Sequence, residues 1–315
     1  MRSIFCFCTL LLVPDVAASV EVEKFLPKET DVIVSVNIRQ ILDSELVKTH
    51  ALELIKSSIS GSKDAQEAIK VMGLDPLTDI NRLSFGMGIE DIGNPRASLV
   101  IEGKFNIKKI QDEMETLAKN NPKQYGVEKV GGKTLYRIAP SNQSPFYIAL
   151  LNSATIVTTT QKEQAATAFD AVQGTTAIAV RKEVLDLLKK ADANASLFLV
   201  AHSKGKLQNL PLIDNEMKRV LNQIQTLTVE VRVTRDASLG ITLVTGTLDE
   251  AKSMAMLIAG GLDLAKVQVK VAVTQQPELQ PISDLVNSMA AEQKEKTITV
   301  TGKVSGESLG KLLKK

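Results

Sequence analysis

Serine and lysine residues three positions apart form the one pattern in this 315-residue chain that could support nucleophilic catalysis. In penicillin-recognising enzymes such a serine begins a helix and works with a Ser-Asp-Asn and a Lys-Thr-Gly motif elsewhere. Here Lys133-Thr134 is followed by Leu135, and Ser283-Asp284 by Leu285, so both partner motifs are broken. The sequence therefore predicts no catalytic residue, and a serine hydrolase is the weakest of three hypotheses. The Ser-x-x-Lys pairs are Ser60/Lys63, Ser203/Lys206 and Ser308/Lys311.

The two histidines, His50 and His202, are the next candidates for chemistry. His50 shares an apolar helical stripe with Val47 and Ala51, and His202 ends an apolar strand. A zinc site needs further ligands at suitable spacing, and no His-x-x-x-His or local acidic cluster supplies them. No Gly-x-Ser-x-Gly elbow accompanies either histidine, so we expect structural roles for both, no metal and no cofactor.

Glycines and threonines at strand positions also have simple structural interpretations. Gly86 and Gly88 lie within a strand pattern, where close approach of a covering element explains them better than a phosphate loop. Gly103, Gly246 and Gly302 follow strands, which predicts turns with positive φ. The threonines of one strand, Thr297, Thr299 and Thr301, alternate with apolar residues as on any exposed sheet face.

Composition excludes several partner classes. Aromatic residues make up 3% of the chain and tryptophan is absent, so stacking platforms for sugars or bases are not expected. The net charge of +2 implies no nucleic-acid partner. At 44% hydrophobic residues the chain is globular, and its length allows two domains.

The first 18 residues resemble a secretory signal peptide. One cation, Arg2, precedes an apolar run from Ile4 to Val13, and the small residues Ala17 and Ala18 suggest cleavage before Ser19. The run is shorter than the ~20 residues of a membrane span, although an uncleaved anchor stays open. We expect an exported protein, periplasmic or extracellular, with no stable membrane span after cleavage. Phe precedes both Cys6 and Cys8, which disfavours lipidation, and cleavage leaves no cysteine for disulfides.

A unit of strand, short polar turn and helix occurs four times, at 97–120, 155–172, 239–260 and 297–313. Asn106 is the predicted cap of the first helix, and capping boxes are predicted at Thr160/Glu163 and Thr247/Glu250. Gly131-Gly132 predicts a two-residue hairpin turn. Alternating valines over 267–273 predict one more strand.

Strands with one apolar and one polar face favour antiparallel sheets with helices on one side. An offset of 165 residues aligns Val32 with Leu197 and Val34 with Leu199, and both halves then run strand, helix, strand, strand, helix. The predicted fold is therefore α+β with two similar halves, each a mainly antiparallel sheet with helices covering one face. The expected boundaries are 1–18 for the signal peptide, 19–175 for the N-terminal domain and 176–315 for the C-terminal domain.

Three short phrases resemble uncharacterised exported proteins of planctomycete-type bacteria. They are 25–37 (FLPKETDVIVSVN), Leu42-Asp43-Ser44 and Leu74-Asp75-Pro76-Leu77 before a strand. The resemblance covers most of the chain after the signal segment. It implies a signal peptide and a tandem α+β fold, and it assigns no catalytic or binding residue.

Two hypotheses therefore precede the serine hydrolase. The first is a non-enzymatic binding or structural module that acts through its surface on a protein partner. The second is a carrier of a lipid or other apolar ligand, held between a curved sheet and helices rich in Ala, Leu and Met, such as the segment with Met254, Met256, Leu257 and Ile258.

Overall fold

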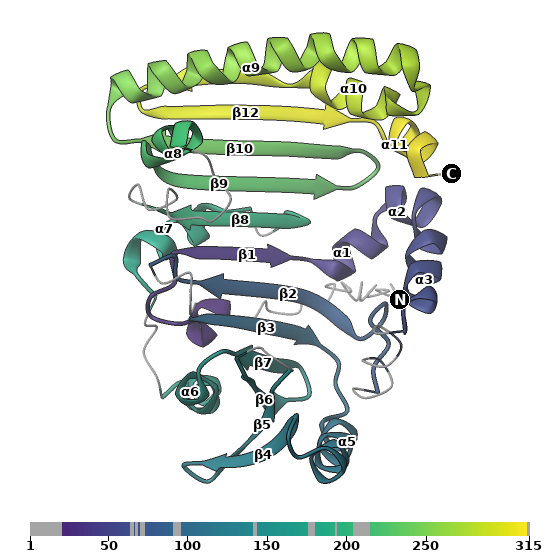
Figure 1. Cartoon of the computed structure of the whole chain (residues 1–315), viewed down its shortest axis with the longest axis vertical. Coiled ribbons are helices and arrows are strands. Elements are labelled where there is room, and N and C mark those ends of the chain that lie inside the picture. Colours follow the sequence, from purple (N-terminus) through teal and green to yellow (C-terminus); the bar gives the residue numbers. More distant parts are fainter. Residues whose placement is uncertain are drawn as a thin grey trace, which may run out of the picture.

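The computed structural model shows an α+β protein in which helices surround one large antiparallel sheet (Figure 1). It describes residues 21–313 except 64–65, 67–68, 70–72, 91–95, 141–143, 176–179, 193 and 204–214. The predicted signal peptide and its cysteines lie outside the described residues. None of the helices in the described part is long and apolar enough to cross a bilayer.

The sheet has twelve strands in the order β11-β12-β10-β9-β8-β1-β2-β3-β7-β6-β5-β4. The strands are β1 (Val32–Val36), β2 (Ile80–Met87), β3 (Ala97–Gly103), β4 (Tyr125–Val130), β5 (Lys133–Ile138), β6 (Phe146–Asn152), β7 (Thr155–Thr159), β8 (Leu197–His202), β9 (Ile224–Val233), β10 (Ala237–Thr245), β11 (Ala290–Lys294) and β12 (Thr297–Val304).

The described helices lie at the ends and on the faces of this sheet. They are η1 (Val22–Phe25), α1 (Ile38–Asp43), α2 (Glu45–His50), α3 (Leu52–Gly61), α5 (Ile107–Asn120), α6 (Lys162–Val172), α7 (Lys182–Lys190), α8 (Asn215–Asn222), α9 (Leu248–Gln275), η3 (Pro277–Leu279), α10 (Gln280–Ser288) and α11 (Gly306–Leu313).

Strands from both predicted halves join at the centre of the sheet. β1 pairs with β2 on one side and with β8 on the other, both antiparallel. The centre of the β1–β8 ladder is Val34 opposite Leu199. The domain boundary at 175/176 stays a prediction, because residues 176–179 lie outside the described ones.

Several local signals form the structures they predict. The Asn106 side chain accepts a hydrogen bond from Lys109 N and caps α5. Thr247 and Glu250 form a reciprocal capping box at the start of α9. Gly131 and Gly132 join β4 to β5 with φ of 56° and 79°, a conformation that costs glycine nothing. All four predicted strand-turn-helix units are present, as β3–α5, β7–α6, β10–α9 and β12–α11.

Two local predictions are wrong. The Thr160 hydroxyl accepts a hydrogen bond from Ala97 N on the neighbouring strand, and α6 starts after Gln161 without a side-chain cap. The valines of 267–273 lie within the 28-residue helix α9 and form no strand. In a helix, residues two apart point to different sides while residues four apart share one, so alternate valines supply both faces of α9 with apolar groups.

The prediction of positive φ at three strand-end glycines is also wrong, because the positive-φ glycines described are Gly73, Gly131, Gly132 and Gly174. Gly103 is required by space instead: a Cβ there would lie 2.0 Å from the carbonyl oxygen of Asp79. At Gly302 a Cβ would meet the Met289 and Leu285 side chains at 3.0 and 3.3 Å, and at Gly246 it would meet Glu250 at 3.0 Å.

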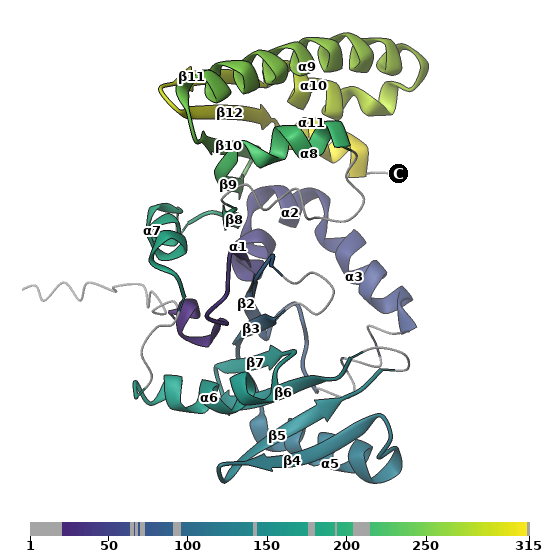
Figure 2. The ribbon, with the colours of Figure 1, turned by 60° about the vertical axis from the view of Figure 1, so that its left-hand side comes forward.

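Helices pack on both faces of the sheet, contrary to the expectation of one covered side. Val157 of β7 belongs to a buried cluster with Ala165 of α6 and Val184 of α7. Its neighbour Ile156 points to the opposite face and packs in a second cluster with Ile110 of α5. Figure 2 shows α6, α7 and η1 on one side of the strands and α3, α5, α8, α9 and α10 on the other.

Candidate functional site

The Ser-x-x-Lys serines do not form a nucleophilic site where they are described. Ser203 is completely buried and its hydroxyl donates to the carbonyl of Ile224, while Lys206 lies outside the described residues. The Ser308 hydroxyl donates to the Asp284 carboxylate, and Lys311 pairs with Glu307 at 3.8 Å. Ser60 is exposed near the end of α3, with Lys63 three residues further on. Each described contact of these serines is one that holds the fold together.

The histidines lie in structural surroundings. His50 ends α2, and its ring covers Gly310 of α11 so closely that a Cβ there would lie 2.5 Å from Nδ1. His202 ends β8 with 8% of its surface exposed. Within the described residues no group of three or more His, Cys, Asp and Glu side chains could hold a metal ion.

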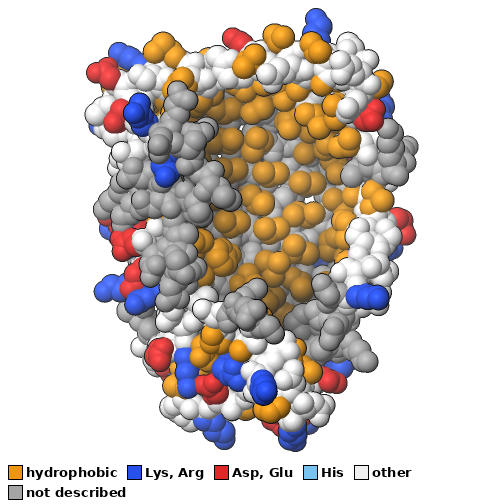
Figure 3. Space-filling view, in the orientation of Figure 1, with side chains coloured by type: hydrophobic (Ala, Val, Ile, Leu, Met, Phe, Trp, Pro, Cys, Tyr) orange, Lys and Arg blue, Asp and Glu red, His pale blue; other side chains and the backbone are white. Residues whose placement is uncertain are grey.

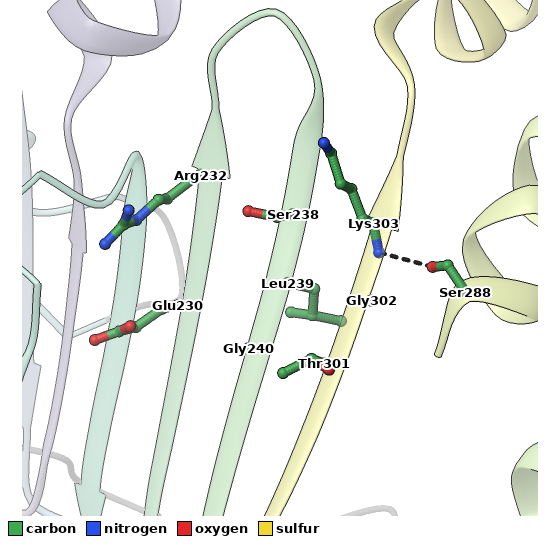
Figure 4. Close-up of a pocket in the computed structure, with 9 residues that line it drawn as sticks. All are labelled: Glu230, Arg232, Ser238, Leu239, Gly240, Ser288, Thr301, Gly302 and Lys303. Carbon is green, nitrogen blue, oxygen red and sulfur yellow. Dashed lines mark hydrogen bonds between the residues drawn. The ribbon is translucent and has the colours of Figure 1, made fainter. Parts of the chain in front are cut away.

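A shallow polar depression of about 410 Å³ crosses β9, β10 and β12 (Figure 4). Its lining residues are Glu230, Arg232, Ser238, Leu239, Gly240, Ser288, Thr301, Gly302 and Lys303.

The charged groups of this polar depression already have partners in the fold. Glu230 accepts a hydrogen bond from Asp192 N, Arg232 pairs with the Asp192 carboxylate, and Lys303 pairs with Asp236 at 3.0 Å. The N–H of Gly306 and the Lys303 ammonium lower the pKa of Asp236. Charges paired in this way stabilise the loops around them, so the depression is a weaker candidate site than the opposite face of the sheet.

The opposite face carries a broad set of large apolar side chains that belong to none of the four buried clusters. Each of them is partly exposed. We call this set the open face; it consists of Val34, Val36, Leu83, Phe85, Met87, Leu99, Leu197, Leu199, Val229, Val231 and Ile241.

The strand register makes the open face continuous. Val34 lies opposite Phe85 on one side and opposite Leu199 on the other. The same row continues through Val229 to Ile241. Because directly opposed side chains in an antiparallel pair lie ~5 Å apart, these rows form an apolar surface that spans six strands, β10 to β3.

On β1, β2 and β3 the reverse side carries serines and a glycine and is covered, whereas on β9 and β10 it forms part of the polar depression. Ser84 and Ser35 are 0% and 3% exposed, and their hydroxyls hydrogen-bond to each other at 2.9 Å. Leu26, which follows η1, packs on Gly86 so tightly that a Cβ there would lie 2.8 Å from it. We call this side the covered face; it includes Ile33, Ser35, Ser84, Gly86, Ser98 and Val100.

The open face lies at the bottom of a recess. Figure 3 shows apolar side chains gathered across the middle of the molecule, set behind a rim. Helices form that rim. In Figure 2, α9 with α10, α8, α3 and α5 project from the strands on this side of the sheet. Part of the rim packs on the ends of the strands: Met254 of α9 lies in a cluster with Val32 and Leu243. The arrangement provides a wide apolar floor with helical walls.

Comparison of the chain with known protein families, with curated proteins and with solved structures finds no match. The resemblance to exported planctomycete-type proteins therefore stays a prediction. The candidate site depends on the geometry of the chain alone.

No site residue is predicted from the sequence, but the close approach of a covering element predicted at Gly86 and Gly88 is confirmed by Leu26 and the Glu29 carbonyl. A signal for the open face was present in the alternate positions. The residues between the large apolar ones on β2 are Ser84 and Gly86, which are too small for a solvated face and suited to one that is tightly covered. When the small side of a strand is the covered one, the large apolar side lacks an equally close neighbour.

Proposed function

We propose that this protein is an exported, non-enzymatic binding protein that holds an elongated apolar ligand, of the lipid acyl-chain class, on the open face. One observation carries the proposal: large apolar side chains remain partly exposed across six strands, while the serines on the reverse side of β1, β2 and β3 are buried. A folded protein gains ~25 cal/mol for each Å² of apolar surface removed from water. An apolar ligand on this face would supply the burial that the described residues do not.

The dimensions of the open face suit a long chain. Six strands at ~4.8 Å spacing extend about 24 Å across the sheet, which is comparable with an extended acyl chain. The floor is lined by aliphatic groups and one aromatic ring, Phe85, so it supports a ligand without strong directional polar contacts.

A protein partner is less well supported, although it was the first hypothesis from the sequence. A typical protein interface is a broad surface of ~800 Å² per partner. The rim of helices around the open face admits a slender ligand more readily than a broad, flat protein surface. The absence of an enzymatic role is part of the proposal, supported by the structural contacts of Ser203, Ser308 and His50.

We also propose that the chain arose by duplication of an α+β unit, as the sequence offset suggests. The support is that the aligned residues Val34 and Leu199 lie opposite each other at the centre of the β1–β8 ladder. Two related units that meet through equivalent edge strands would build one open face from both halves.

The test is ligand retention and rebinding. Native mass spectrometry of protein purified from its own host should show a mass excess that organic extraction removes. The extracted protein should then bind a fluorescent long-chain fatty acid, and Leu199→Asp should weaken binding at least about tenfold because a carboxylate lies poorly against an acyl chain. The milder variant Val229→Thr keeps the side-chain shape and should weaken binding about threefold.

The matched control is Val127→Asp, which places the same charge on an apolar residue that is 41% exposed on β4, away from the open face. Its affinity should equal that of the unchanged protein. A clean mass without ligand, together with no binding of the fatty acid, would overturn the proposal. Equal loss in Leu199→Asp and Val127→Asp would place the binding elsewhere.

A further inference from the structure

Helix α9 carries a second apolar surface that faces away from the protein. We call it the outer stripe; its side chains and their exposed fractions are Met256 69%, Leu257 59%, Leu264 58%, Val267 62% and Val271 55%. In Figure 1 and Figure 2, α9 forms the upper edge of the molecule.

The outer stripe is distinct from the side by which α9 packs on the sheet. Ala251 and Met254 are buried, and Ile258 packs with them against Ile298 of β12. Gly260 is nine residues from Ala251, which at 100° per residue places it on the opposite side of the helix. A helix that is apolar on both sides needs a neighbour on both, and the fold supplies only one among the described residues.

The spacing of the outer stripe matches helix pairing. Leu257, Leu264 and Val271 are seven residues apart, and Gly260 and Val267 lie between them at intervals of three and four. This spacing is the seam of a helix pair. A membrane-surface helix would instead place mainly cationic residues beside its apolar side. Here the charges of the whole helix balance, with Asp249, Glu250 and Asp263 against Lys252, Lys266 and Lys270.

The stripe is also complementary to itself. In an antiparallel pair with a twofold axis at Leu264, Leu257 lies opposite Val271 of the second copy, and Gly260 lies opposite Gln268, one residue from Val267. A glycine gives the opposing side chain room to approach the backbone. No described residue requires glycine here, because a Cβ at Gly260 would meet no atom within 4 Å, and the same holds for the adjacent Gly261. Gly260 weakens the helix and is explained by a neighbour outside the chain.

We propose that a second copy of this chain docks on the outer stripe, with the two α9 helices antiparallel about a twofold axis at Leu264. A seam one helix wide buries roughly half of the ~800 Å² per partner of a standard interface. The dimer is therefore reversible and grows with protein concentration. The proposal is independent of the ligand proposed for the open face, which lies on the other side of α9.

Cysteine cross-linking tests the geometry, because Cys6 and Cys8 are the chain's only cysteines. In a chain carrying Cys6→Ser and Cys8→Ser, Leu264→Cys should form a disulfide-linked dimer under mild oxidation. Leu257→Cys alone should not, whereas a mixture of Leu257→Cys and Val271→Cys proteins should. The control Val127→Cys, exposed on β4, should give no dimer above background.

A second measurement separates loss of the dimer from loss of the fold. Gly260→Leu fills open space in the monomer, so the melting temperature should stay or rise, while the dimer dissociation constant measured by analytical ultracentrifugation should increase at least about tenfold. An unchanged dissociation constant in Gly260→Leu, or equal cross-linking at Leu264→Cys and Val127→Cys, would overturn the proposal. So would a protein that stays monomeric and binds phosphatidylcholine/phosphatidylglycerol vesicles through Leu264.

Discussion

The two sides of the central strands reverse the usual relation between side-chain size and burial. On β2, Ser84 is completely buried while the adjacent Phe85 is partly exposed. On β1, Ser35 is buried between partly exposed Val34 and Val36. The covered face has small side chains because η1 and Leu26 lie directly on it, and no element in the described part of the chain covers the large apolar side chains of the open face as closely. Packing among the described residues therefore does not account for the open face.

The strongest test of this comparison is a matched pair of leucine truncations. Leu135→Ala removes a fully buried side chain from the cluster under α6 and should cost about 3–4 kcal/mol of unfolding free energy, because it leaves a cavity. Leu199→Ala removes a partly exposed side chain from the open face and should cost only about 1 kcal/mol, because water already reaches the site.

Urea denaturation of the ligand-free protein measures both truncation costs. Losses of equal size would mean that the open face is packed as tightly as an ordinary core, and the comparison of the two faces would fail. When ligand is added, the cost of Leu199→Ala should rise, since bound ligand stabilises the folded state.

A smaller effect is expected from the ion pair that fastens α7 to the covered side. Asp31 is buried, accepts a hydrogen bond from Ile89 N, and pairs with Arg181 Nη1 at 2.7 Å. Arg181→Met leaves the carboxylate buried without its counter-charge, which should cost about 2 kcal/mol, less than a fully buried pair because 29% of the Arg181 side chain is exposed.

The control for this ion pair is Arg96→Met. Arg96 pairs with Glu29 at 2.9 Å, but both side chains are well exposed, so the change should cost less than about 0.5 kcal/mol. Thermal unfolding of both variants under the same conditions measures the difference. If both losses are equally small, Asp31 does not anchor the covered side.

The sequence predicts those parts of the fold that depend on short-range chemistry. The Gly131-Gly132 hairpin, the Asn106 cap and the Thr247/Glu250 capping box all form between residues close in the chain. The capping prediction at Thr160 fails because its hydroxyl oxygen instead accepts a hydrogen bond from Ala97 N, on a strand 63 residues earlier in the chain. The strand predicted at 267–273 fails because alternation of valines also fits a helix with two apolar sides.

The candidate site needed the tertiary structure for a similar reason. Alternation identifies Val34, Phe85 and Leu199 as one side of their strands, and it does not say which side other elements cover. That choice is made by Leu26, which reaches Gly86 from 60 residues earlier in the chain. The pairing of β1 with β8 could not be predicted from local sequence patterns either, because it joins residues as far apart in the chain as Val34 and Leu199, 165 positions.

The smallest expected effect is a pH-dependent change in stability at α10, one of the rim helices. The hydroxyl of Ser308 in α11 donates to Asp284 in α10, and this hydrogen bond, with a second from Gln280, lowers the pKa of Asp284. A lowered folded-state pKa stabilises the protein above the unfolded value of ~3.9, and the contribution is lost as the pH falls through the folded pKa. Ser308→Ala should therefore raise the pKa of Asp284 and flatten the fall of stability in acid.

Carboxyl NMR titration of Asp284 measures this shift directly, and urea midpoints across the acid range measure its effect on stability. The matched control is Ser288→Ala, because the Ser288 hydroxyl donates to Leu285 O in the same helix α10 and accepts from Lys303 N, and its described hydrogen bonds do not include Asp284. The pKa of Asp284 should stay unchanged in Ser288→Ala. If both variants shift the pKa of Asp284 equally, the shift reflects a general loosening of α10. The Ser308 bond would then not be what joins α10 to α11 beside the open face.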